Sequence, residues 1–274
     1  MKLIRVAISG CCGRMGMGIG RLILRDRRFF LAGGIENKKS AHVGKNLGQY
    51  LNGKKSGAFI TDDCRQALEN ADVLIEFSSP QATISHLKDC LALKKPVIIG
   101  TTGLSESDEK KIRAASAKIP IVKSSNMSLG INLLFGILTD ILKKIGSYYD
   151  IEIIETHHNQ KKDAPSGTAL TMAKIICESL GLDFKKAVRC GRRGKTGPRP
   201  KKEIGIHAIR AGKIIGDHTV VFAGEGERIE LAHHAQSRDA FAMGALLAAQ
   251  FACDKKKGLY DMQDVLMQGK KIWV

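Results

Sequence analysis

A polar stretch between residues 155 and 168 holds the side chains best suited to chemistry. It contains two adjacent histidines, His157 and His158, and then Lys161. Imidazoles can donate or accept a proton near neutral pH, and a lysine adds a fixed cation beside them. These residue types suit an anionic substrate that must also be protonated. The alternative is that the paired histidines are ordinary surface residues of a loop.

The flanking elements place this stretch between a strand and a helix. Residues 151–155 are typical of a buried strand, and apolar residues recur at helical spacing from Ala169 onward. Pro165 suits the first helical turn because it has no N–H group to lose. The helix start would then offer backbone N–H groups and hydroxyls to a carboxylate, through Ser166, Gly167 and Thr168.

A glycine turn near the N-terminus predicts a dinucleotide site. An apolar strand at residues 3–9 leads into glycines spaced G-x-x-G-x-x-G and then into a helix. A second strand, at 29–35, ends in Glu36, close to the ~20 residues past the last glycine at which an acid binds the ribose hydroxyls. The residues of the turn expected to contact the cofactor are Gly10, Cys11, Cys12, Gly13, Arg14 and Met15.

The residues after Glu36 bear on the choice of cofactor. Asn37 lacks the positive charge that would offset a 2′-phosphate, whereas Lys38 or Lys39 could offset it in part. We therefore expect both NADH and NADPH to be used, with NADH favoured.

Strands and helices continue to alternate and predict an α/β fold. Further strands are expected at 58–61, 73–77, 96–99 and 120–123, with helices between them. This order predicts a Rossmann-like, doubly wound parallel sheet with right-handed crossovers. Later strands at 204–209, 217–223 and 228–232 follow one another between glycines, which predicts an α+β second domain with an open mixed sheet.

The central stretch, Glu-x-His-His-x-x-Lys-x-Asp-Ala-Pro-Ser-Gly-Thr-Ala at residues 155–169, resembles the signature of the 4-hydroxy-tetrahydrodipicolinate reductase family, also called dihydrodipicolinate reductase. The turn Gly-x-x-Gly-Arg-Met-Gly at residues 10–16 resembles the same family. The resemblance implies an NAD(P)H-dependent reduction, with loss of water, of 4-hydroxy-2,3,4,5-tetrahydrodipicolinate to tetrahydrodipicolinate. This step belongs to the diaminopimelate route to L-lysine.

That chemistry assigns roles to the candidate residues. His157 is the best-placed proton donor, and Lys161 can hold a carboxylate and assist protonation. The remaining anion contacts fall to His158, Ser166, Gly167 and Thr168. By resemblance, further cofactor contacts are Asn37, Gly100, Thr101, Thr102, Ser124, Ser125, Asn126 and Met127. The reaction needs no metal.

The resemblance also implies the domain plan and the assembly. Residues 1–127 and 238–274 would form the dinucleotide-binding domain, and residues 128–237 the domain for substrate binding and tetramerisation. Apolar residues of the later strands would be covered by a second copy, giving a homotetramer. These residues are Ile204, Ile206, Ile209, Val220, Phe222, Ile229 and Leu231.

Composition limits the class of protein and its location. The chain has 274 residues, 43% hydrophobic and 26% charged, which suits a globular protein of two domains. No uncharged apolar run approaches the ~20 residues of a membrane span, and residues 1–8 lack the pattern of a signal peptide. The seven cysteines include no Cys-x-x-Cys, which argues against disulfides and a zinc site. We expect a cytoplasmic protein with reduced thiols and no membrane partner.

The formal charge of +17 raises nucleic acid as a partner. A basic run without acids contains Lys185, Lys186, Arg189, Arg192, Arg193, Lys195, Arg199, Lys201 and Lys202. Only Phe184, at its edge, could stack on a base, and no nucleic-acid motif accompanies the run. A solvated loop that attracts a small anion explains it equally well, so we expect no nucleic-acid partner.

Two other functions are open at this stage. One is a dehydrogenase of another small acid on the same plan, because a fold does not fix a function. The other is a non-catalytic sensor of the NAD(H) pool, which would not need His157 and Lys161 together.

Overall fold

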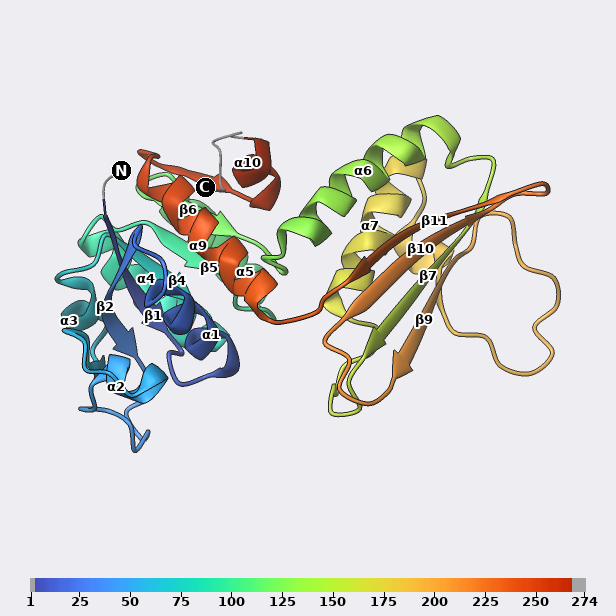
Figure 1. Cartoon of the computed structure of the whole chain (residues 1–274). Coiled ribbons are helices and arrows are strands. Elements are labelled where there is room, and N and C mark those ends of the chain that lie inside the picture. The colour runs from blue at the N-terminus through green and yellow to red at the C-terminus, as the bar shows by residue number, and fades with distance from the viewer. Residues whose placement is uncertain (1–2, 268–274) are drawn as a thin grey trace. The chain divides into compact units, whose positions relative to one another are not determined.

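A computed structural model describes residues 3–267 and divides the chain into two compact units (Figure 1). The first unit comprises Met1–Leu129 and Arg238–Val274, and the second comprises Gly130–Ser237. The boundaries expected from the sequence, after residues 127 and 237, lie within two residues of this division. Both ends of the chain therefore contribute to the first unit.

The first unit contains a seven-stranded parallel sheet in the order β12-β6-β5-β4-β1-β2-β3. Six of the strands alternate with helices in the way the sequence predicted, which confirms the doubly wound fold. The short C-terminal strand β12 was not predicted. The strands are β1 (Ile4–Ser9), β2 (Phe29–Ile35), β3 (Ile60–Thr61), β4 (Val73–Glu76), β5 (Val97–Ile99), β6 (Pro120–Lys123) and β12 (Gly258–Tyr260).

Helices cover both faces of this sheet because neighbouring strand residues point to opposite sides. Val6 and Ile8 of β1 join the core formed with α1, α2, α9 and α10, whereas Ala7 joins the core formed with α3, α4 and α5. The helices are α1 (Arg14–Ile23), α2 (Leu47–Asn52), α3 (Cys64–Leu68), α4 (Pro80–Ala92), α5 (Glu106–Ser116), α9 (Asp239–Cys253) and α10 (Met262–Met267). As Figure 1 shows, helix α9 lies across this sheet.

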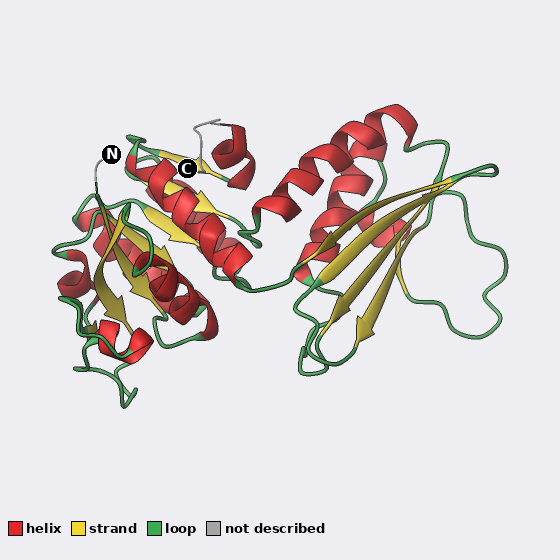
Figure 2. Cartoon of the chain, viewed as in Figure 1, coloured by secondary structure: helices red, strands yellow, loops and turns green. Residues whose placement is uncertain are grey.

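The second unit contains a mixed five-stranded sheet in the order β11-β10-β7-β9-β8 (Figure 2). Strand β10 is antiparallel to both of its neighbours, whereas β7, β9 and β8 are parallel to one another. The strands are β7 (Asp150–His157), β8 (Val188–Cys190), β9 (Ile204–Arg210), β10 (Asp217–Ala223) and β11 (Arg228–His234). The helices are α6 (Leu129–Ile145), α7 (Gly167–Leu180) and α8 (Phe184–Ala187).

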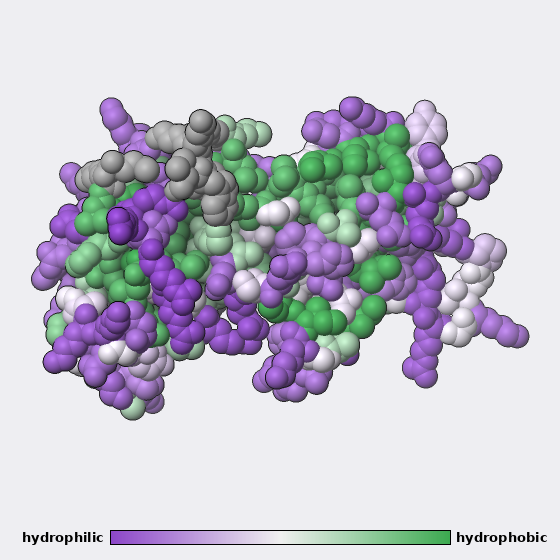
Figure 3. Space-filling view, viewed as in Figure 1, coloured by the Kyte–Doolittle hydropathy of each residue, from purple (hydrophilic) through white to green (hydrophobic). Residues whose placement is uncertain are grey.

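The apolar strand residues of the second unit do not form the exposed face that we expected. Six of the seven pack with α6 and α7 in the core of this unit: Ile204, Ile206, Val220, Phe222, Ile229 and Leu231. Ile209 alone of the seven lies on the outer face, and it is 47% exposed, as Ile154 of β7 is 36% exposed. The seven apolar residues therefore belong to two opposite faces of the sheet. Hydrophobic side chains also gather over α6 (Figure 3), where Leu133 and Ile137 are exposed.

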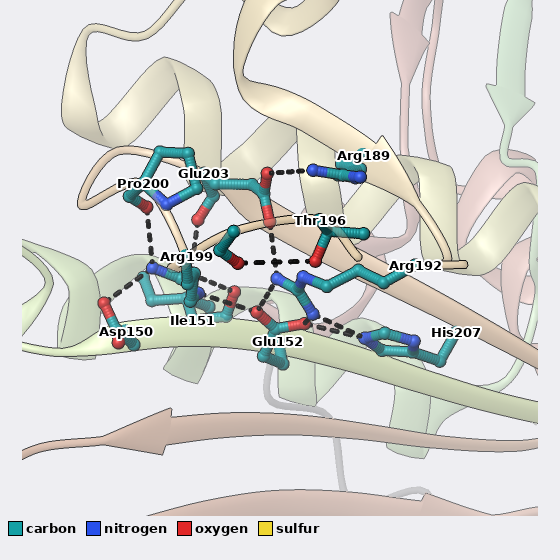
Figure 4. A network of polar contacts seen from close by, with 11 residues as sticks. Asp150, Ile151, Glu152, Arg189, Arg192, Thr196, Arg199, Pro200, Glu203 and His207 are labelled. Atoms are coloured by element: carbon teal, nitrogen blue, oxygen red, sulfur yellow. Dashed lines mark hydrogen bonds and ion pairs between the residues drawn. The ribbon is translucent and has the colours of Figure 1, made fainter. Parts of the chain in front are cut away.

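Part of the basic run folds onto the sheet instead of forming a solvated loop (Figure 4). Arg192 Nη2 and Arg199 Nε lie 2.7 and 2.8 Å from Oε1 of Glu152, on β7. Arg192 Nη2 also lies 2.5 Å from Oε1 of Glu203. Burial alone would raise the pKa of Glu152, but Arg192, Arg199 and His207 lower it to about 2. These two arginines therefore hold the loop against the sheet.

Within residues 3–267, no helix combines the length and the apolar character that crossing a bilayer would require.

Candidate active site

His157 occupies the last position of β7, two residues beyond the predicted end of that strand. The sequence predicts a loop at His157 because polar residues follow Glu155. Residues two apart on a strand share a face, and His157 Nδ1 lies 2.6 Å from Oε2 of Glu155. The strand, not a flexible loop, therefore fixes the position of the imidazole.

Glu155 is a fully buried carboxylate surrounded by donors. Arg210 donates to both of its oxygens, from Nη1 and Nη2, each at 2.8 Å. The backbone N–H of Ser166 donates to Oε1 at 3.0 Å. Burial would raise the pKa of Glu155, but Arg210, His157 and the Ser166 N–H outweigh burial and lower it. Glu155 therefore remains a carboxylate that can orient the imidazole through Nδ1.

The environment of His157 controls its protonation. Burial lowers its pKa below 6.5, the charges of Lys161 and Arg210 lower it further, and Glu155 opposes them. Because Nδ1 faces the carboxylate, Nε2 is the ring atom left to exchange a proton with a substrate. A side chain at Gly216 would begin 3.0 Å from Nε2, so glycine at this position keeps space beside that atom.

The start of α7 lies beside this pair. Ser166 is the N-cap, and its Oγ accepts from the N–H of Ala169 at 3.2 Å. Pro165 precedes the cap and is joined to Ala164 by a cis peptide bond, so the prediction that it begins the helix was wrong. Gly167 is exposed and Thr168 is half-buried in the first turn, whose N–H groups point out of the helix end.

Two residues of this site, His218 and Arg210, were not identified from the sequence. His218 is 3% exposed; its Nε2 lies 2.9 Å from Ser166 Oγ, and its ring centroid is 5.2 Å from that of His157. Burial lowers its pKa to about 3. Strand register would have revealed both, because His218 lies opposite Glu155 and Arg210 opposite His157.

Lys161 and His158 follow β7 in the same segment. Lys161 Nζ lies 3.0 and 2.9 Å from the two carboxylate oxygens of Asp163, and its side chain is 19% exposed. Its backbone N–H donates to the carbonyl of His158 at 3.1 Å, and His158 is half-buried. The structure thus brings the charge of Lys161 close enough to His157 to lower the pKa of that histidine.

The first unit contains a cleft of about 930 Å³ at the carboxyl ends of β1, β2 and β4. Parallel α/β sheets bind ligands at this edge. Five of the predicted cofactor residues line the cleft: Gly10, Cys12, Gly13, Glu36 and Asn37. Lys38 and Lys39 line it as well.

The glycine turn fits a pyrophosphate. Gly10 has φ +70°, and a Cβ there would lie 2.5 Å from the carbonyl oxygen of Phe77. A Cβ on Gly16 would lie 2.2 Å from the carbonyl oxygen of Gly10. Helix α1 begins after Gly13, and within residues 3–267 no side chain caps it. Its first N–H groups are therefore available to an anion.

Other predicted cofactor residues lie outside the lining of this cleft. Cys11 is fully buried, Arg14 is exposed and Met15 is half-buried. Gly100 packs against the ring of Phe77, and Thr101 is buried and accepts a hydrogen bond from Thr83. Ten of the predicted cofactor residues are not among those that line the cleft: Cys11, Arg14, Met15, Gly100, Thr101, Thr102, Ser124, Ser125, Asn126 and Met127.

A buried acid and a histidine also contribute to this cleft. Glu76, at the end of β4, is fully buried, and its Oε2 lies 2.7 Å from Nδ1 of His86. Ser78 donates its N–H to Oε1 of Glu76 at 3.0 Å. His86 and Ser78 line the cleft, and neither was identified from the sequence. The carboxyl end of a predicted parallel strand was the signal that could have identified them.

The doubly wound sheet, its glycine turn and the acid at the end of β2 define a dinucleotide-dependent oxidoreductase that carries a second unit. Residues 4–127 match the family model described as dihydrodipicolinate reductase, N-terminus, and residues 130–266 match the C-terminal model. The chain belongs to the dihydrodipicolinate reductase family, whose members use NADH or NADPH.

Relatives agree with this assignment, and a solved structure shares the fold. A 4-hydroxy-tetrahydrodipicolinate reductase from Neisseria gonorrhoeae is 45% identical over 263 residues, covering 96% of this chain and 97% of the relative. A reductase of the same name from Syntrophus aciditrophicus is 42% identical, covering 96% of this chain and 98% of the relative. The dipicolinate-bound dihydrodipicolinate reductase from Paenisporosarcina sp. TG-14 has a TM-score of 0.74 at 24% identity, covering 96% and 99%, and supports the fold.

Proposed function

We propose that the chain reduces 4-hydroxy-2,3,4,5-tetrahydrodipicolinate to tetrahydrodipicolinate, with loss of water, in the diaminopimelate route to L-lysine. Its full-length relatives at 41–45% identity carry the name of that reductase. The observation that carries the proposal is the buried Glu155, which orients His157 beside the start of α7. A sensor of NAD(H) would not need this arrangement.

His157 is proposed as the proton donor. Loss of the 4-hydroxyl as water leaves a conjugated imine, and a dinucleotide would supply, when bound, the hydride that reduces it. The electron density that remains must take up a proton, and Nε2 of His157 can deliver it because Nδ1 is held by Glu155. A dianionic substrate would raise the pKa of His157, since nearby negative charge favours the imidazolium form.

Lys161 and the start of α7 are proposed to hold the two carboxylates. A lysine acts as a point charge for a carboxylate, and the N–H groups and hydroxyls of Ser166, Gly167 and Thr168 suit an anion. Lys161 now pairs with Asp163, whose side chain is 66% exposed, so a substrate carboxylate can replace this acid at little cost. His158 supplies a further contact. The dipicolinate in the Paenisporosarcina structure is also a cyclic dicarboxylate.

The first unit is proposed to hold the cofactor. The N–H groups at the start of α1 would bind the pyrophosphate, and Glu36 the ribose hydroxyls. Glu36 already accepts from the N–H groups of Cys12 and Asn37, at 3.1 and 3.0 Å, which fixes its carboxylate at the edge of the cleft. The segment 100–102 is proposed to lie along the nicotinamide half, and the segment 124–127 is proposed as a further cofactor contact.

A homotetramer and a cytoplasmic location complete the proposal. The outer face of the five-stranded sheet, with Ile154 and Ile209 exposed, is the surface that a second copy would cover. The seven free thiols suit a reducing compartment. A monomeric mass in light scattering at micromolar concentration would refute the assembly.

A coupled assay tests the reaction. The product of the preceding synthase is supplied, and oxidation of NADH and of NADPH is followed by absorbance. Steady oxidation that requires the cyclic substrate is expected with both. Oxidation with other small keto acids but not with this substrate would favour a different dehydrogenase, and no turnover with any substrate would favour a sensor.

A further inference from the structure

Two adjacent cysteines form part of the glycine turn between β1 and α1. The Sγ atoms of Cys11 and Cys12 lie 3.9 Å apart. Cys11 is fully buried, whereas Cys12 is half-buried and lines the cleft of the first unit. Two thiolates bound to one tetrahedral zinc at about 2.3 Å each would be separated by roughly 3.8 Å. The spacing of the two sulfurs thus already matches a shared metal ion.

Glu36 adds a third ligand atom to this pair. One carboxylate oxygen and the two sulfurs all lie within 4.8 Å of one another. Carboxylate oxygens bind zinc at about 2.0–2.2 Å, so a small adjustment of the Glu36 side chain completes three positions of a tetrahedron. Because Cys12 and Glu36 line the cleft, the fourth position would be open to it.

We propose that Cys11, Cys12 and Glu36 form a binding site for a thiophilic divalent cation, for which Zn²⁺ is the probe, and that this cation excludes the dinucleotide. Binding forms two metal–sulfur bonds and one metal–oxygen bond, and each thiol releases its proton to solvent. The metal would coordinate the carboxylate of Glu36, which is proposed to bind the ribose hydroxyls. It would also draw Glu36 away from the N–H groups of Cys12 and Asn37 that now hold it.

The spacing of the cysteines in the sequence could not reveal this site. The lack of a Cys-x-x-Cys pair argues against zinc, whereas here the two thiols are adjacent and the third ligand lies 24 residues after Cys12. The parallel pairing of β1 with β2 brings the ends of these strands together. Burial raises the pKa of both thiols, so the pair is protonated until a metal displaces the protons.

Direct binding is the first test. Zinc chloride is titrated into the reduced full-length protein by calorimetry and with a competing zinc dye. One ion per chain is expected, with affinity lowered at least tenfold by Cys12→Ser and by Cys11→Ala. Cys190→Ser is the matched control, because Cys190 is exposed on β8 of the second unit. Unchanged affinity in both turn variants, with melting temperatures showing that they fold, would overturn the proposal.

Competition is the second test, and it alone rests on the proposed dinucleotide site. Zinc should raise the apparent KM for NADH without lowering kcat, and saturating NADH should weaken zinc binding in the calorimeter. Inhibition competitive with the dicarboxylate would instead assign zinc to the histidines of the second unit and refute the site. The binding test needs no turnover, so it stands even if the proposed reaction fails.

Discussion

His157 Nδ1 lies 2.6 Å from Oε2 of Glu155, a carboxylate that solvent does not reach. This contact leaves Nε2 as the ring atom that can exchange a proton. Arg210 and the N–H of Ser166 keep Glu155 ionised and in place. The contact therefore acts on the protonation and the orientation of His157, and both can be measured.

Glu155→Gln should lower kcat by roughly 10- to 100-fold, because an outer partner that orients a functional imidazole is lost. Glu155 raises the pKa of His157 against burial. Its loss should therefore shift the alkaline limb of the kcat profile to lower pH, since His157 must be protonated to act as an acid. The pH dependence of kcat is the measurement.

Glu152→Gln is the matched control for Glu155→Gln. Glu152 lies on the same strand and also pairs with arginines, but on the outer face of the sheet. It should change the melting temperature and leave the pH profile of kcat in place. Equal profiles for the wild type and Glu155→Gln would show that Glu155 has a structural role only.

His157→Ala removes the proposed acid itself. Turnover should fall by the ~100- to 10,000-fold typical of losing a general acid, with a smaller change in the KM for the dicarboxylate. The affinity for NADH, measured by fluorescence titration, should stay near that of the wild type. Near-normal turnover, or a loss of NADH binding, would refute the assignment.

Lys161→Ala should damage both kcat and KM, because a carboxylate loses its cation and the transition state loses charge stabilisation. Steady-state kinetics with varied dicarboxylate concentrations would measure both constants. Lys162→Ala is the matched control, since Lys162 is the exposed neighbour in the same segment. If the two variants lose activity equally, the effect comes from the overall charge of the segment and not from a contact of Lys161.

Local patterns in the sequence predicted most helices and strands, but they did not predict contacts between residues of different strands. The predicted bounds of β2, β6 and β10 match the structure residue for residue. Arg210 and His218 were missed because their partners, His157 and Glu155, lie more than 50 residues away and only strand register brings them together. The outer face of the sheet was misjudged because local patterns do not show which face of each strand the helices cover. Val220 lies on the covered face and Ile209 on the outer face.

Asn37→Arg should improve the use of NADPH. Asn37 lines the cleft beside Glu36, and a charge-assisted hydrogen bond to the 2′-phosphate contributes about 1.5–3 kcal/mol, so the KM for NADPH should fall by about tenfold or more. The KM for NADH should change little because NADH lacks that phosphate. The two constants are measured side by side, and equal KM values for NADPH before and after the change would show that Asn37 does not face this phosphate.

The buried His218 should make the protein sensitive to acid. Burial lowers its pKa from 6.5 to about 3, so the unfolded chain binds a proton that the folded chain refuses. This contribution to stability is complete above pH 6.5 and is lost progressively as the pH falls toward 3. At ~1.4 kcal/mol per pH unit, it should amount to about 2 kcal/mol between pH 6.5 and pH 5.

His218→Gln, whose amide can still reach Ser166, should lose less stability over this interval in urea denaturation. His234→Asn, at an exposed histidine of β11, is the control and should behave as the wild type. If the free energy of unfolding of His218→Gln falls with pH as steeply as that of the wild type, other groups cause the acid sensitivity.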